Sequence, residues 1–486
     1  MPSPSHIDLQ AIAKDVMRQR GFHPDFPQEV QEQLADLRAN PPQIATGNDI
    51  RDLRNLLWSS IDNDTSRDLD QVEVTESLPN GSTKIMVGIA DVDAYLAKAS
   101  PIDVHAASET TTVYAGVRNF PMLPEQLSTG QTSLLENQDR LSLVIEFIVD
   151  DVGNVGADNA YRALTRNHAQ LQYNSVAAWL ENTASAPANV AASAALQAQL
   201  RVQDTTAQTL KKQRHEHGSL DLETTELTPL LHNDQVVGLV PQQKNRATDL
   251  IEEFMIAANG VMARMLAKVS SLRRVVKTPE RWDRIVELAA QNGEKLPPDP
   301  DSKALSEFLL RRKAVDPDHF ADLSLAVIKL VGPGEYVLER PGDPSLGHFG
   351  LAVQDYTHST APNRRFADIV TQRTIKALLA GKPHPFSDNE LAGIAANCTE
   401  KEKAARKVER DMSKRLAAAA LQNRIGAIFD AMVTGVTPHG TFVRSLQPHI
   451  EGLLAQGQQG LDVGDRLKVK LIRTDVLHGF LDFARA

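Results

Sequence analysis

The spacing of apolar residues changes several times along this chain of 486 residues. Residues 1 to about 55 alternate helical runs, LQAIAKDVMRQRG and EVQEQLADLRA, with proline-rich breaks, which predicts a small helical module. From residue 59 to 98, apolar and polar residues alternate in QVEV and KIMVGIADV, on either side of a PNGS turn. A period of two on both sides of a turn predicts a β-hairpin.

Helical periodicity dominates the middle of the chain. Two helical stretches lie between 170 and 225, and Gly218 is placed to end the second as a C-terminal cap. Residues 246–269 predict a long amphipathic helix, and further helices fill 280–330. A strand-like FGLAVQDYTHS then precedes a helix that begins near Asn363. A sheet followed by helices predicts an α+β body.

The end of the chain has short alternating runs separated by glycine-containing turns, such as IFDAMVTGV, TFVRSL and DRLKVKLIRTD. About five such strands predict a small all-β barrel of the OB-fold type. We therefore expect three parts: a helical module over residues 1–55, an α+β catalytic body over 56–420 and a barrel over 421–486.

Composition narrows the class of protein. The sequence has no secretion signal and no uninterrupted apolar span of about 18 residues, so we expect a soluble, cytoplasmic protein with no membrane partner. The 52 Lys and Arg against 62 Asp and Glu give a net charge of −10, which disfavours a protein that coats nucleic acid through a general positive field. The single Cys398 cannot form an internal disulfide and is expected to fill a helix.

Positive charge gathers between Lys401 and Arg424, where eight Lys or Arg stand against three acids. Such a segment is typical of a helix that faces phosphate, and equally typical of a solvated helix with Glu–Lys pairs. Charge alone does not separate the two readings, and both stay open.

Carboxylates recur in the segment SIDNDTSRDLDQ, at Asp62, Asp64, Asp68 and Asp70. Hard divalent cations prefer oxygen ligands, and a catalytic Mg²⁺ takes one or two carboxylates together with water and substrate phosphates. The segment therefore predicts a metal site, against two competing readings: a solvated acidic turn and an EF-hand calcium loop. The calcium loop fails at its sixth position, where Arg67 replaces the glycine that the turn needs, and its flanks alternate like strands.

Further motifs follow the acidic segment in order: GIADVDAY from Gly88, Tyr114 with FPMLP from Phe120, EEFMIAAN from Glu252 and HSTAPNRRF from His358. Together with the acidic segment, they resemble the ribonuclease II and ribonuclease R family over residues 56 to about 395. The resemblance implies an RNB catalytic domain of mixed sheet and helices. It also implies a hydrolytic exoribonuclease that trims RNA from the 3′ end, releases nucleoside 5′-monophosphates and uses Mg²⁺.

The resemblance also implies roles for the acidic residues. By the spacing of the family motif, Asp62, Asp68 and Asp70 match its first three catalytic aspartates, which bind the metal and the attacking water. Gln71 stands where the family has a fourth aspartate, and its neutral carbonyl can bind Mg²⁺ but supplies no charge. This departure leaves an alternative function, in which the chain is a catalytically impaired relative that binds RNA without cutting it.

Two neighbouring arginines match the family's phosphate contact. Arg364 corresponds to the arginine at the scissile phosphate, and Arg365 beside it is the second choice. The fork of a guanidinium suits a bidentate contact with phosphate. The competing reading is an Arg pair that opens a helix after Pro362 and contacts only solvent.

The same resemblance also implies which residues contact single-stranded RNA. Tyr114 and Tyr173 match tyrosines that stack on bases near the 3′ end, although each could be an ordinary core residue. In the helix that begins at residue 246, either Glu252 or Glu253 is expected to hydrogen-bond the terminal ribose. The sequence does not decide between the two glutamates.

The tail resembles the S1-type RNA-binding barrel that those enzymes carry. Aromatic side chains in such barrels stack on bases, and the expected stacking residues are Phe429, His439 and Phe442. A basic rim is expected from Arg444, Lys468 and Lys470. A barrel that only packs against the body is the competing reading.

The front of the chain departs from the family pattern. Relatives usually place two cold-shock-type barrels before the catalytic body, whereas fewer than sixty residues precede it here. We therefore expect a different entry for RNA, with residues 1–55 serving either as a nucleic-acid-binding module or as a packing segment. Single-stranded RNA is the expected partner, and a monomer is the expected state.

Overall fold

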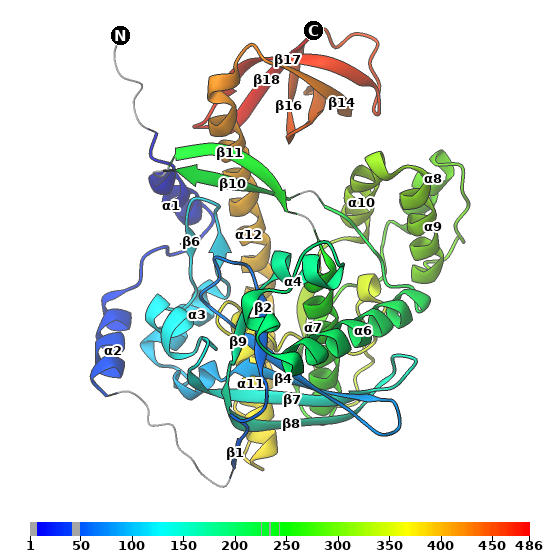
Figure 1. Ribbon diagram of the computed structural model, residues 1–486. Helices are drawn as coiled ribbons and strands as arrows, with labels where there is room; N and C mark the ends of the chain where they lie inside the picture. The colour runs from blue at the N-terminus through cyan, green and yellow to red at the C-terminus, as the bar shows by residue number, and fades with distance from the viewer. Residues whose placement is uncertain (1–6, 41–48, 225, 233–234, 243) are drawn as a thin grey trace.

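The computed structural model describes residues 7–40, 49–224, 226–232, 235–242 and 244–486. Figure 1 shows a sheet with its helices at one end of the molecule and a small barrel at the other, with the long helix α12 (Asp388–Leu421) running between them. Mixed helices and strands confirm the predicted α+β class. In the described part of the chain, no helix is both long and apolar enough to span a membrane.

A seven-stranded sheet organises the body, in the order β1-β8-β7-β4-β3-β2-β9. Its strands are β1 (Ile50–Asp52), β2 (Ser59–Asp62), β3 (Gln71–Ser77), β4 (Thr83–Ala90), β7 (Asp139–Val149), β8 (Val155–Arg166) and β9 (Ala169–Gln172). The predicted hairpin is confirmed as the antiparallel pair β3 and β4. The sheet begins earlier than residue 56, because β1 already pairs with β8.

Helices cover both faces of this sheet. One face carries α4 (Tyr173–Leu180), α6 (Ala194–Glu216) and α7 (Arg246–Met265); the other carries α3 (Pro101–Glu109), α11 (Phe366–Leu379) and the first half of α12. Strand β4 shows the consequence, because Ile85 and Val87 lie in one hydrophobic core while Met86 and Ala90 lie in the other. Each such buried aliphatic side chain stabilises the fold by roughly 1.5–3 kcal/mol.

The helix predicted from residue 246 is confirmed as α7. Asn245 caps it by accepting hydrogen bonds from the backbone N–H groups of Ala247 and Thr248, in a capping box. Gly218 follows the end of α6 with φ +95°, as a C-terminal cap requires, and a Cβ there would meet the backbone nitrogen of Lys303 at 2.6 Å.

The strand expected over residues 349–359 is wrong. The segment forms a short 3-10 helix, η4 (Phe349–Leu351), and then irregular backbone. Side chains and separate backbone groups hold it: the Arg274 N–H donates to the Tyr356 carbonyl at 3.0 Å, and the Thr357 hydroxyl donates to the Leu272 carbonyl at 2.8 Å. Among the described residues the segment forms only an isolated bridge, between Val353 and His348, so its alternating pattern joins no sheet.

Both helices expected at the front are present, as α1 (Leu9–Gln19) and α2 (Gln28–Ala39). They pack against different parts of the body, α1 against α12 and α2 against α3.

The remaining α-helices and strands of the body are α5 (Ala188–Ala191), α8 (Trp282–Gln291), α9 (Ser302–Val315), α10 (Pro317–Val331), β5 (Val113–Tyr114), β6 (Asn119–Phe120), β10 (Glu226–His232), β11 (Gln235–Gln242), β12 (Ser271–Val275) and β13 (Glu335–Glu339).

The basic segment 401–424 falls mostly on α12, and several of its cations already contact protein. Lys401 donates to the Gly21 carbonyl at 2.6 Å, Arg406 pairs with Glu402 at 2.6 Å, and Arg415 donates to the carbonyls of Leu477 and Asp411. The helix thus ties α1 and the barrel to the body. The buried Cys398 fills this same helix, as expected.

Five strands close into the predicted C-terminal barrel: β14 (Ile428–Thr437), β15 (Gly440–Leu446), β16 (His449–Gln456), β17 (Arg466–Asp475) and β18 (Phe480–Arg485). Gly452 permits the close pairing of β16 with β18, since a Cβ there would meet the Leu481 carbonyl oxygen at 2.5 Å. An ion pair between Arg444 and Asp322 of α10 joins the barrel to the body, with Arg444 Nη2 2.6 Å from a carboxylate oxygen.

Candidate active site

The acidic segment forms the connection between β2 and β3. Leu69 is buried in the hydrophobic core, and its N–H donates to the Ser133 hydroxyl oxygen at 2.9 Å. The same hydroxyl donates to the Arg67 carbonyl at 2.7 Å. Because Leu69 is anchored in this way, Asp68 and Asp70 on either side of it are held in place. The flanking strands also exclude the helix–loop–helix frame of a calcium loop.

Asp70 joins the acidic segment to the HSTAPNRRF segment, 293 residues further along the chain. One carboxylate oxygen accepts the Asn363 N–H at 2.9 Å, and the other lies 3.4 Å from Nε of Arg364. The side chain is only 3% exposed. Burial raises the pKa of Asp70 to about 7, although the charge of Arg364 acts in the opposite direction.

The other two aspartates stand nearer to solvent. Asp62 ends β2 and accepts hydrogen bonds from the Ser66 hydroxyl at 2.8 Å and the Asn63 N–H at 2.7 Å. Partial burial raises the pKa of Asp68, and the negative charge of Asp62 adds to that effect. The predicted aspartates and Arg364 are therefore brought together in one place.

The two neighbouring arginines are used differently. Half of the Arg364 side chain, 49%, is exposed beside Asp70. Arg365 instead makes two hydrogen bonds to the fully buried carboxylate of Asp368, at 2.8 and 2.7 Å, and so fixes the start of α11. Arg364 is the one that keeps a guanidinium available to a phosphate.

Sequence reasoning assigned no role to the side chains that hold the Arg364 segment. Asn259 of α7 accepts hydrogen bonds from the N–H and the hydroxyl of Ser359, at 2.9 and 2.8 Å. Asn363 accepts the Thr132 hydroxyl at 2.6 Å. The signal was an Asn on an otherwise apolar helix face, because a buried amide must find partners.

The two predicted tyrosines lie on either side of these charges. Tyr114 is 41% exposed, and burial of its hydroxyl raises its pKa to about 12 while nearby Arg364 lowers it. Tyr173 begins α4, directly after the β9 residue that pairs with Asp62. Burial raises the pKa of Tyr173, and the charges of Asp62 and Glu73 raise it further.

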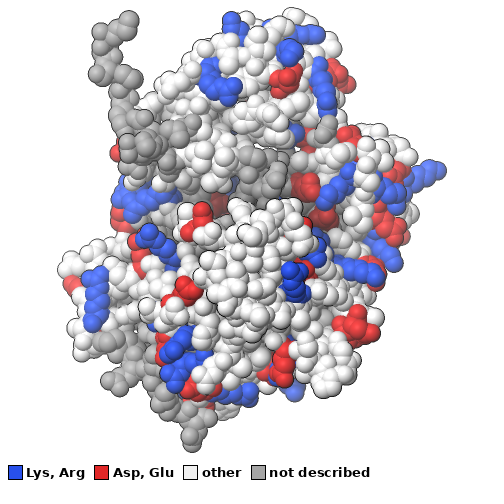
Figure 2. Space-filling model, viewed as in Figure 1, with Lys and Arg blue, Asp and Glu red and all other residues white. Residues whose placement is uncertain are grey.

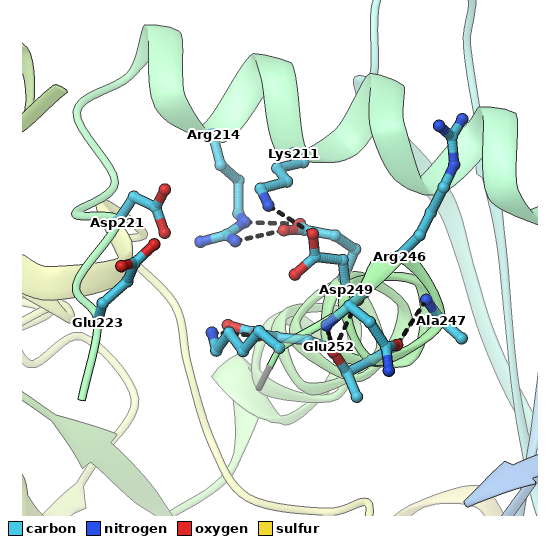
Figure 3. Close-up of polar contacts among 12 residues, drawn as sticks. Lys211, Arg214, Asp221, Glu223, Arg246, Ala247, Asp249 and Glu252 are labelled. Atoms are coloured by element: carbon cyan, nitrogen blue, oxygen red, sulfur yellow. Dashed lines mark hydrogen bonds and ion pairs between the residues drawn. The ribbon is translucent and has the colours of Figure 1, made fainter. Parts of the chain in front are cut away.

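The two glutamates of α7 have different surroundings, and Figure 3 labels Glu252 together with Lys211 and Arg214 of α6. Glu253 is buried and accepts two hydrogen bonds from Arg214 of α6, at 2.7 and 2.5 Å. Glu252 is partly exposed and pairs with the exposed Lys244 at 2.7 Å. Glu253 is thus occupied by the protein, whereas Glu252 is partly exposed to solvent.

The predicted stacking residues of the barrel differ in how far their rings are exposed. Phe429 is 5% exposed and packs edge-on against Phe483 in the barrel core. This burial leaves no ring face for a base, so we exclude Phe429 from the RNA surface. His439 is exposed in the turn after β14, and Phe442 is partly exposed on β15.

The expected basic rim is weaker than the sequence suggested. Residues 427–486 hold six Lys or Arg and six Asp or Glu, and on the face in Figure 2 the two kinds are interspersed. Arg444 is occupied by Asp322, and Lys468 pairs with Asp430 at 2.9 Å. Lys470 is exposed on β17.

Among the described residues, no three His, Cys, Asp or Glu side chains are grouped as a complete metal site. The residues present nevertheless fit a divalent cation that brings its own waters. Asp70 is a buried acid with one partial counter-charge, and three residues further along the chain a carboxylate oxygen of Glu73 is buried without a hydrogen-bond partner. Mg²⁺ commonly takes one or two carboxylates and completes its shell with water and substrate phosphates.

Comparisons with known proteins agree with this arrangement. The RNB domain family matches residues 50–381, and the RNase II-type exonuclease C-terminal S1 domain matches residues 427–486. Ribonuclease R of Thermotoga maritima is 28% identical over 98% of this chain and 70% of its own length. Ribonuclease R of Escherichia coli is 31% identical over 88% of this chain, which spans 54% of that relative.

Among solved structures, Mycoplasma genitalium RNase R in complex with ribose methylated single-stranded RNA has the same fold. Its TM-score is 0.87 at 24% identity, and the match covers 99% of this chain and 78% of that one. The family match extends over more than half of the chain, including the acidic segment and Arg364. The chain therefore belongs to the RNB-domain family of exoribonucleases of the ribonuclease II and R type.

Proposed function

We propose that this chain is a Mg²⁺-dependent hydrolytic exoribonuclease that degrades single-stranded RNA from its 3′ end and releases nucleoside 5′-monophosphates. The observation that carries the proposal is the meeting of Asp70 with Arg364, at 3.4 Å, beside Asp62 and Asp68. A phosphodiester hydrolase needs this combination of an acidic, metal-binding side and a cationic side facing one phosphate.

Asp62, Asp68 and Asp70 would hold the cation, with the Gln71 carbonyl as a neutral ligand. When bound there, Mg²⁺ would activate water and neutralise charge on the phosphate. Arg364 points its half-exposed guanidinium at the same place and can contact two phosphate oxygens at once. Asp70 keeps that guanidinium oriented, and Asn363 fixes Asp70.

The tyrosines hold the 3′ end of the strand. Their rings lie beside the charged groups, where stacking on successive bases places the last phosphate between the aspartates and Arg364. Stacking does not depend on base identity, so little sequence preference is expected. Glu252 would accept a hydrogen bond from the terminal ribose, and the 2′-hydroxyl offers the donor that DNA lacks.

The barrel contributes a second contact with the strand. His439 and Phe442 offer partly exposed rings, and Lys470 adds an exposed cation. The solved structure of Mycoplasma genitalium RNase R is a complex with ribose methylated single-stranded RNA, which supports single-stranded RNA as the partner of this chain. Because the barrel carries equal numbers of acids and bases, its contribution should depend more on stacking than on general attraction.

The test follows a 5′-labelled oligoribonucleotide under single-turnover conditions with Mg²⁺. We expect progressive shortening of the labelled strand and release of mononucleotides, no shortening in EDTA, and no shortening of the oligodeoxynucleotide of the same sequence. Asp70→Asn keeps the acceptor for Asn363 but removes the charge, and should abolish cleavage while RNA binding persists. Full activity of that variant would refute the site.

Gln71 favours one second candidate, an RNA-binding protein without cleavage. Its side chain is buried at the start of β3 and brings no charge to the position where the family has an aspartate. In this case the oligoribonucleotide would bind tightly and keep its length. Binding without shortening at any Mg²⁺ concentration would establish this candidate over the enzyme.

A further inference from the structure

Glu73 is an acidic residue in the middle of a buried sheet, and no sequence motif assigns it a role. It lies on β3, opposite Ser59 of β2 and Val87 of β4. Side chains two residues apart on a strand share a face, so Glu73 lies on the same face of β3 as Gln71. Strand β2, which it opposes, leads directly to Asp62.

The Glu73 carboxylate has no compensating partner in the described structure. The residue is 1% exposed, and its Oε1 atom is buried without a hydrogen bond. A buried carboxylate without a partner is costly, and such groups are retained mainly where they serve a function.

Two neighbours locate this carboxylate relative to the candidate active site. Ser59 of β2 pairs with Glu73, and the same strand ends at Asp62, which pairs with Gln172 directly before Tyr173. The Glu73 carboxylate therefore lies on the strand next to the one that carries the proposed metal-binding aspartate. A cation held by Asp62 and Gln71 would be attracted by it.

We propose that Glu73 supplies the metal site with the negative charge that Gln71 does not bring. This inference rests on the proposed Mg²⁺ site. The side chain approaches from the same strand face as Gln71, so the neutral amide oxygen and the carboxylate act on one cation together. The departure at position 71 is then compensated two residues further along β3.

The experiment measures metal binding without RNA. Mn²⁺, which reports on Mg²⁺ sites, is titrated into the full chain, and the free ion is counted by electron paramagnetic resonance. Glu73→Gln should weaken Mn²⁺ binding at least tenfold, close to the loss in Asp62→Asn. Glu76→Gln is the matched control, because Glu76 lies on the same strand, is exposed and pairs with Lys84 at the surface; it should bind Mn²⁺ like the wild type.

Two further variants separate charge from structure. Adding Gln71→Asp to Glu73→Gln should restore Mn²⁺ affinity, because it returns one carboxylate to the same strand face. Glu73→Asp keeps the charge and should retain affinity within a few fold. In EDTA, Glu73→Gln should melt no lower than the wild type, since it removes an uncompensated acid.

Unchanged Mn²⁺ affinity in Glu73→Gln would overturn the inference. So would a Gln71→Asp, Glu73→Gln double variant whose Mn²⁺ affinity is no higher than that of Glu73→Gln. A fall in melting temperature in EDTA with wild-type Mn²⁺ affinity would likewise assign Glu73 a structural role. These outcomes are distinct from failure of the proposed activity. A chain whose Mn²⁺ binding depends on Glu73 but which leaves RNA intact would retain the inference and lose the exoribonuclease.

Discussion

Two groups of acids in this molecule differ in whether the protein supplies a matching positive charge. At the start of α7, Glu253 receives two hydrogen bonds from Arg214, and Asp249 pairs with Lys211 at 2.6 Å (Figure 3). Beside β3, Asp70 has only Arg364 at 3.4 Å, and Glu73 has no cation. Both groups are buried, but only the first is neutralised by the protein itself.

The difference separates structural acids from functional ones. A paired buried charge holds two elements together. Removing one partner leaves the other charge buried and uncompensated in the low-dielectric interior. An unpaired buried acid reduces stability, so its retention points to a ligand that completes the charge balance. The acids of α7 fasten it to α6, whereas we propose that those near β3 receive a cation.

The largest effect should come from breaking the paired group. Arg214→Ala leaves Glu253 buried and unpaired, and should lower the free energy of unfolding by about 3–5 kcal/mol. Denaturant unfolding measures it. Lys212→Ala, at an exposed position on the same helix, should change it by less than about 0.5 kcal/mol. Similar losses in both variants would mean that α6 is destabilised generally.

Adjacent arginines give the next largest effect. Arg364→Ala should reduce kcat/KM on RNA by about 10²–10³-fold, the usual loss for a group that stabilises charge in the transition state, with little change in melting temperature. Arg365→Ala should instead lower the melting temperature, because it leaves Asp368 buried without its partner. If both variants lost activity at unchanged stability, the assigned division between the two residues would be wrong.

A smaller effect of opposite sign is expected at Asp70. Asp70→Asn removes a buried charge yet keeps the acceptor for the Asn363 N–H, so in EDTA it should raise the free energy of unfolding by about 1–2 kcal/mol. The gain should shrink when Mg²⁺ is added, because the cation stabilises only the wild-type site. A destabilised variant in EDTA would place Asp70 among the structural acids.

The smallest effect concerns pH. Burial lowers the pKa of His348 to about 4, below the value near 6.5 of the unfolded chain. Between these values the unfolded chain binds a proton that the folded chain does not, so stability is complete above pH 6.5 and falls as pH drops toward 4. His348→Gln should reduce the loss between pH 7 and 5.5 by about 1 kcal/mol, and the exposed His217→Gln should not. Parallel pH profiles for the wild type and His348→Gln would contradict this.

Much of the fold could be predicted because its signals are local. The alternation around the PNGS turn predicted the β3–β4 hairpin, the spacing after residue 246 predicted α7, and short runs between glycines predicted the barrel. Residues 349–359 alternate in the same way but form no strand. Alternating apolar and polar residues fit a strand with one buried face, but a segment becomes a strand only when a neighbouring strand pairs with it.

The candidate site was predictable in part for the same reason. Asp62, Asp68 and Asp70 lie within nine residues of one another, so their spacing predicted a metal site, with a calcium loop and a solvated turn as competing readings. Arg364 was located only through the resemblance to a family. Glu73 was also visible in the sequence as a single acid among the apolar residues of QVEV, but that pattern was not used to predict a role.

The sequence by itself determined the elements, the α+β class, the barrel and the short acidic segment, since each depends on residues close together in the chain. Only the tertiary structure decided which charges are satisfied. Glu253 meets Arg214 across 39 residues and Asp70 meets Asn363 across 293, and no local pattern encodes such meetings. Because a buried charge takes its role from its partner, Glu253 and Arg365 have structural roles, while we propose that Asp70, Arg364 and Glu73 stay available for chemistry.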